Sequence, residues 1–72
     1  MDRINVRDAL QETWRSVRLL PGERDGWVEV EDDGEVRWVA LADVHPADLV
    51  ALTFEREARQ RYRWVPREDL EA

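Results

Sequence analysis

A short turn sequence flanked by two alternating stretches constrains this chain more than any other feature. Val28 and Val30 alternate with glutamates before the turn, and valine and tryptophan alternate with charged residues after it. A period of two is typical of a strand with one buried face. The Asp-Asp-Gly sequence at 32–34 can form a three-residue loop with glycine in the left-handed conformation. The sequence therefore predicts a β-hairpin over residues 27–40.

The three-residue loop also sets the register of this hairpin. It pairs Val30 with Val36 and Val28 with Trp38, so these four side chains share one face. Alternation places Trp27 on the opposite face, together with glutamates. Trp38 is therefore expected in the core, and Trp27 on the surface.

Apolar residues near the N-terminus recur at spacings of four and three, which is the pattern of an amphipathic helix. They are Val6, Leu10, Thr13 or Trp14, Val17 and Leu20. Asn5 can cap the start of such a helix, and Pro21-Gly22 can end it. The spacing predicts a helix over residues 5–20 in which Leu10, Trp14 and Val17 are buried.

Residues 46–65 fit two structures. A weak internal repeat of the first hairpin sequence favours a second hairpin, in which Leu52 faces Trp64 and Phe54 faces Tyr62. The rival is one helix from Pro46 to Arg63, with proline in its first turn. Its apolar face would consist of Ala47, Val50, Ala51, Phe54, Ala58 and Tyr62.

We therefore expect one small α+β domain over residues 1–72. An N-terminal amphipathic helix packs on a small antiparallel sheet of two hairpins, and residues 66–72 form a polar tail. The alternative architecture is one hairpin with a second, C-terminal helix.

Composition excludes several classes of protein. The chain has no cysteine for disulfides and no Cys/His cluster for zinc. Its longest uninterrupted apolar stretch spans residues 38–42, far short of the roughly 20 residues of a membrane span. The net charge of −6 disfavours nonspecific attraction to nucleic acid. These features predict a cytoplasmic protein with no disulfide, no structural zinc and no membrane span.

The sequence contains few groups for catalysis. His45, the only histidine, precedes a proline and is expected in a turn with a structural role. Ser16 and Thr13 have no neighbouring base in sequence, and the glycines do not form a phosphate-binding loop. We expect no enzyme, no cofactor, no metal site and no small-molecule substrate.

Binding to a protein, or to a second copy of the chain, is the function that the sequence favours. Tryptophan and arginine are enriched at the energetic centres of protein interfaces. Trp27 is the outward-facing tryptophan, and the segment from Arg56 to Arg67 is rich in arginine. The expected contact residues are Trp27, Arg56, Arg59, Arg61 and Arg63. The protein would then be an adaptor, an accessory subunit or an inhibitor.

Two other functions remain open. An acidic hairpin tip could imitate nucleic acid and occupy a basic site on a target protein. Its residues would be Glu29, Glu31, Asp32, Asp33 and Glu35. Alternatively, the arginines from Arg56 to Arg67 could bind nucleic acid directly, although the net charge makes this the weaker hypothesis.

Overall fold

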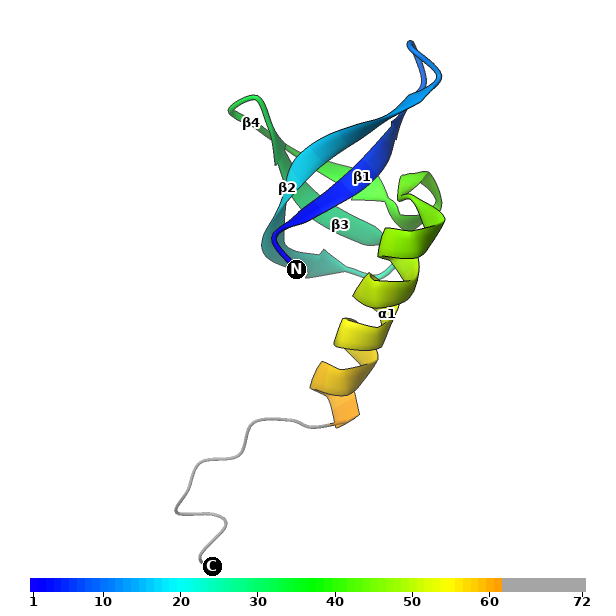
Figure 1. The fold of residues 1–72 in the computed structure, drawn as a ribbon. Helices are drawn as coiled ribbons and strands as arrows, with labels where there is room; N and C mark the ends of the chain where they lie inside the picture. The colour runs from blue at the N-terminus through cyan, green and yellow to red at the C-terminus, as the bar shows by residue number, and fades with distance from the viewer. Residues whose placement is uncertain (62–72) are drawn as a thin grey trace, which may run out of the picture.

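The protein is described here from a computed structural model, which covers the backbone of residues 1–61 and the side chains of residues 1–59. A four-stranded antiparallel sheet with strand order β1-β2-β3-β4 precedes one α-helix (Figure 1). The elements are β1 (Arg3–Asp8), β2 (Thr13–Arg24), β3 (Trp27–Asp32), β4 (Glu35–Ala40), the 3₁₀-helix η1 (Leu41–Asp43) and α1 (Pro46–Arg61). The architecture is α+β, but its elements differ from those expected.

The helix predicted over residues 5–20 is wrong, because this part of the chain forms β1 and β2. Ile4 pairs with Val17 across the two strands, and both side chains are buried. β-branched residues pack well on a pleated surface and lose side-chain freedom in a helix. The turn between the strands is held by Asp8, whose Oδ1 accepts hydrogen bonds from the amides of Leu10 and Gln11 at 3.0 and 3.2 Å.

Burial in this hairpin follows a period of two instead of the predicted helical period. Val17 is buried as expected. Leu10, however, lies in the turn and is 97% exposed, and Trp14 is also exposed. The expectation that all three residues lie together on one buried face is therefore wrong.

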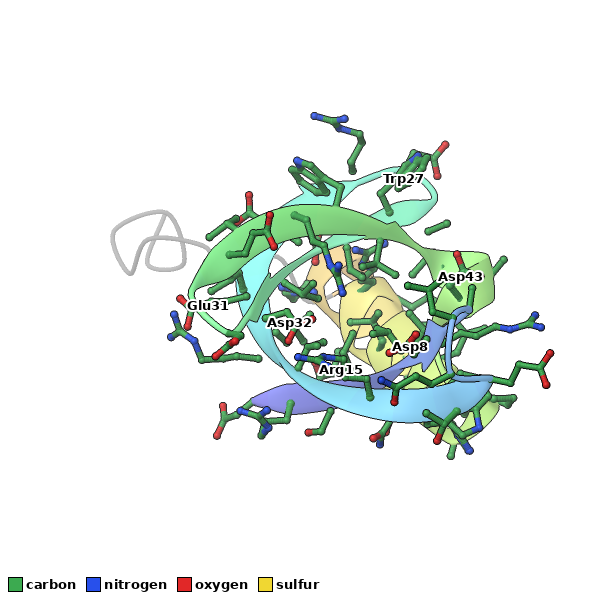
Figure 2. All side chains as sticks on the ribbon, turned by 90° about the horizontal axis from the view of Figure 1, so that it is seen from above. Asp8, Arg15, Trp27, Glu31, Asp32 and Asp43 are labelled. Atoms are coloured by element: carbon green, nitrogen blue, oxygen red, sulfur yellow. The ribbon has the colours of Figure 1, made fainter. Side chains whose placement is uncertain are left out.

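Pro21-Gly22 interrupts β2 without ending it. The pairing of β2 with β3 shifts register between Leu19 and Glu23, as at a β-bulge, where a residue without an N–H is tolerated. A Cβ on Gly22 would lie 2.8 Å from the Glu29 carboxylate, so glycine allows this close approach. β2 thus continues past the bulge to Arg24, and the sheet curls into the ring seen in Figure 2.

The hairpin predicted over residues 27–40 is confirmed, but its register differs by one residue. Val30 pairs with Arg37, and the connection has two residues, Asp33 and Gly34. Both have positive φ, 54° and 84°, as in the Asp-Gly turns whose twist matches that of the strands. The positive φ predicted for Gly34 is correct. The slip turns Arg37 inward and leaves Trp38 only partly buried on the outer face.

The prediction of a second hairpin is wrong as well, since α1 occupies Pro46–Arg61. This helix agrees with the alternative prediction. The buried face of α1 nevertheless differs from the expected one. Leu52 is buried and Leu49 packs against the core, whereas Val50 and Phe54 are 71% and 72% exposed.

The predicted contacts of Trp64 and the polar tail at 66–72 lie outside the described residues. Among the helices that the structure describes, none is long and apolar enough to cross a membrane.

The core lies at one end of the curled sheet, against α1. Its residues are Ile4, Val6, Val17, Val28, Val30, Val44 and Leu52, each at most 2% exposed. At this end the ring is closed, because Val6 bridges to Val44 and the His45 amide donates to the Asn5 carbonyl at 2.8 Å. Asp48 of α1 accepts hydrogen bonds from the amide and side chain of Asn5, which joins the helix to β1.

Candidate functional site

The ring is closed at one end and open along β4. Within the described chain, β4 pairs only with β3, and β1 is joined to the segment after β4 at Asn5 and Val6. From Arg7 onward, β1 and its turn therefore face β4 without a ladder between them. We call the gap between Glu35–Ala40 and Arg7–Leu10 the seam.

A cavity of about 600 Å³ lies along the seam. It is lined by Val6, Arg7, Asp8, Ala9, Leu10, Arg15, Trp27, Asp32, Arg37, Trp38, Val39, Ala40 and Asp43. Its size falls within the range of ligand pockets, roughly 300–1,000 Å³. Figure 2 looks down the ring and shows Asp8, Arg15 and Asp32 inside it. The cavity thus connects the free strand edge with the charged interior of the ring.

One carboxylate joins two arginines in this cavity. Arg15 Nε donates to Asp32 Oδ1 at 2.8 Å, and Arg37 Nη2 donates to Asp32 Oδ2 at 2.9 Å. The hydrogen bond that Arg15 donates to Asp32, followed by the negative charge of this carboxylate, raises the pKa of Arg15 above the ordinary arginine value. Each guanidinium uses one N–H group on Asp32, and both arginines remain about half-exposed. Such a cluster can hold polar groups by ion pairs and hydrogen bonds.

The backbone of β4 supplies the second element of the site. In a hairpin with a two-residue turn, opposed residues alternate between hydrogen-bonded and non-hydrogen-bonded pairs, beginning with Asp32 and Glu35. By this alternation the N–H and C=O groups of Val36, Trp38 and Ala40 point away from β3. They form the free edge of the sheet beside the seam.

The outer face of the β3–β4 hairpin carries aromatic side chains. Trp27 is 42% exposed, and Trp38 lies diagonally across the strand pair from it. The guanidinium of Arg24 stacks over the Trp38 ring at 4.4 Å from its centroid, within the range of a cation–π contact. The face combines the two residue types that most often anchor protein interfaces.

The structure brings together three of the contact residues predicted from the sequence. Arg56 of α1 donates to the carbonyl oxygen of Trp27 at 2.7 Å. Arg56 and Arg59 both form ion pairs with Glu23 of β2. The side chain of Arg61 and all of Arg63 lie outside the described parts of the chain. Arg56 and Arg59 therefore lie near the backbone of Trp27, and Glu23 partly neutralises their positive charge.

The five predicted residues of the acidic tip do not form one acidic surface. Asp32 points inward to its two arginines, and Glu31 pairs with Arg18 at 2.8 Å. Glu29 lies beside Gly22 on the outer face. Asp33 and Glu35 remain exposed at the tip. The arrangement mixes charges of both signs, unlike the regular array of a nucleic-acid backbone.

His45 has a structural environment at the start of α1. Its Nδ1 accepts a hydrogen bond from the Ala47 amide at 3.1 Å, and its ring packs edge-on against Trp14 at 4.7 Å between centroids. Among the described residues, no group of His, Cys, Asp or Glu is placed to hold a metal ion.

No family model, curated protein or solved structure matches the chain.

The free edge of β4 is not among the features expected from the sequence, although one sequence signal points to it. This signal is Asp33-Gly34, which by itself suits a two-residue turn. Such a turn places Arg37 on the inner face beside Asp32 and exposes the backbone groups of Val36.

Proposed function

We propose that the protein is a non-enzymatic interaction module that pairs an extended segment of a partner protein along β4. The observation that carries this proposal is the free edge itself, which opens onto the seam. An exposed edge is a template for another strand, and extended peptides bind many domains by extending a sheet in this way. The main-chain groups of Val36, Trp38 and Ala40 would provide the hydrogen bonds.

The two sides of the added segment would meet different surfaces. Side chains alternate along a strand, so every second one would point into the cavity near Arg37 and Asp32. The others would lie on the outer face beside Val36 and Trp38. Backbone pairing would give affinity, and the alternating contacts would give selectivity. Trp27 would extend the outer contact.

The electrostatics support a protein partner over nucleic acid. The chain carries a net charge of −6, which repels phosphate backbones. Arg56 and Arg59 are paired with Glu23, so the arginine segment is partly neutralised where it is described. The acidic decoy gains no support either, because Asp32 and Glu31 are engaged by arginines of the chain itself.

The edge can be tested by removing a single N–H group. Val36→Pro deletes a donor that faces the seam, at a position that is 56% exposed and on an edge strand, where proline is tolerated. Val36→Thr keeps the donor and the β-branched shape. The tagged wild type and both variants are used to retain proteins from extracts of the native host, and thermal melting confirms that all three are folded.

We expect Val36→Pro to lose a protein that the wild type and Val36→Thr retain. With that protein bound, amide exchange should slow at Trp38 and Ala40. A retained partner that binds all three chains equally, with no slowing of exchange on β4, would contradict the proposal.

A further inference from the structure

The tip of the β3–β4 hairpin is accessible to a second molecule. Figure 1 shows the turn between these strands projecting from the sheet on the side away from α1. Gly34, Glu35 and Val36 are all exposed, and Val36 is the exposed aliphatic residue nearest the turn on β4. The free edge of β4 begins at this residue. A partner could therefore pair with the tip without displacing the core.

The charges at this tip are not balanced within the described chain. Glu35 lies directly opposite Asp32, and like charges in opposed positions destabilise a strand pair. Asp32 is compensated by Arg15 and Arg37. Among the described residues, Glu35 forms no ion pair. A cation brought to the inner face beside Glu35 would remove this imbalance.

A second copy of the chain would supply such a cation at the required position. Resting on the proposed strand pairing, we infer that two copies associate through antiparallel pairing of their β4 strands about a two-fold axis at Val36. In this register residue 35 of each copy lies opposite residue 37 of the other. Glu35 of one copy then faces Arg37 of its partner, and the same contact recurs on the other side of the axis.

The backbone alternation of β4 supports this register. The N–H and C=O groups of Val36 point to the free edge, so Val36 and its symmetry copy form a hydrogen-bonded pair. Glu35 and Arg37 then fall in non-hydrogen-bonded pairs, whose Cα atoms approach to about 4.5 Å. Trp38 lies across from Gly34 of the other copy, where an aromatic ring can cover a glycine that has no side chain.

Another register is less complementary. A two-fold axis at Trp38 would place Arg37 opposite Val39 and Glu35 opposite Leu41, so neither charge would gain a partner. The axis at Val36 pairs both charges and also joins two exposed valines. Ion pairs at an exposed edge are individually weak, so the dimer should be weak and should dissociate further at high salt.

Charge exchange between the copies tests this inference on the full chain. Glu35→Arg places arginines opposite arginines in the proposed dimer, and Arg37→Glu places glutamates opposite glutamates. Each variant alone should raise the dimer dissociation constant at least about tenfold. An equimolar mixture of the two variants restores opposite charges at both contacts and should form heterodimers about as tightly as the wild type. Sedimentation equilibrium of single and mixed samples measures this.

A matched control is Arg3→Glu, which makes the same charge change on β1, where the exposed side chain contacts Ser16 and not the tip of the β3–β4 hairpin. It should leave the dimer dissociation constant within about threefold of wild type. A wild-type chain that stays monomeric would overturn the inference. Single variants that dimerise like wild type, or a mixture that stays monomeric, would overturn it too.

Failure of the self-pairing can be separated from failure of the proposed function. If the chain is monomeric but Val36→Pro still loses a protein that Val36→Thr retains, the edge binds a different partner and only this inference is wrong. If Val36→Pro dimerises like wild type and also retains every captured protein, neither proposal stands.

Discussion

The two ends of the curled sheet use the same inner face for opposite purposes. On β2 the inward residue changes from Val17 at the closed end to Arg15 at the open end. On β3 the inward residue changes from Val30 to Asp32, and on β4 it likewise changes from an aliphatic to a charged residue. The closed end is sealed by α1 and by the bridge from Val6, whereas the open end holds an ion cluster beside an unpaired strand.

This difference explains why the two ends differ in availability for binding. Aliphatic side chains gain stability only when water is excluded, so they require the cover that α1 provides. Arginine and aspartate can satisfy one another and still contact water, so the open end needs no cover. The fold therefore combines a stabilising end and an accessible end in one small sheet.

The largest expected effect breaks the closed end. Leu52→Ala removes a side chain that is 2% exposed and should lower the free energy of unfolding by about 2–5 kcal/mol. Phe54→Ala, two residues along the same helix, removes a larger but 72% exposed side chain and should change it by less than about 0.5 kcal/mol. Urea denaturation followed by circular dichroism measures both. Equal losses would show that α1 packs with a different face.

A smaller effect is expected at the turn of the open end. Gly34 has a φ of 84°, and no atom lies within 4 Å of the place that a Cβ would occupy, so a side chain there is disfavoured by the backbone conformation and not by crowding. Gly34→Val should lower the free energy of unfolding by at least about 1–2 kcal/mol, because the left-handed region disfavours β-branched residues. Asp33→Asn should be nearly neutral, since asparagine also tolerates this region.

This pair of variants is compared by thermal melting. A Gly34→Val protein as stable as the wild type would mean that the turn does not constrain the β3–β4 register. The argument for the free groups of Val36 would then fail as well.

The sequence predicts the β3–β4 hairpin better than the rest of the chain. Asp-Gly between alternating stretches identifies the β3–β4 hairpin, because the turn requires positive φ. The N-terminal apolar spacing fits a helix, but Ile4, Val6 and Val17 also fit two strands if a turn lies between them. That turn contains neither glycine nor proline, and its signal is the Asp8 side chain, which bonds to the following amides.

The candidate site can be predicted only in part. The sequence selects Trp27, Arg56 and Arg59 as contact residues, but their proximity depends on long-range contacts of α1 with the end of β2 and the start of β3, which periodicity does not reveal. The seam depends on a one-residue register slip in the hairpin. Such a slip moves every side chain of a strand to the other face, so a small error in the turn conceals the ion cluster.

The smallest expected effect concerns the ion cluster of the open end. Asp32→Asn removes the charge shared by Arg15 and Arg37 while keeping the shape of the side chain. It also relieves the repulsion from Glu35, which lies directly opposite. Because the arginines are about half-exposed, water and salt screen their attraction to Asp32.

The net loss for Asp32→Asn should therefore stay below about 1 kcal/mol and should shrink further near 1 M salt, where the screening length falls to about 3 Å. Urea denaturation of wild type and variant at low and high salt measures both quantities. A loss of about 3 kcal/mol that salt does not reduce would be typical of breaking a buried ion pair. The open end would then contribute to the core, and the contrast between the two ends of the sheet would be wrong.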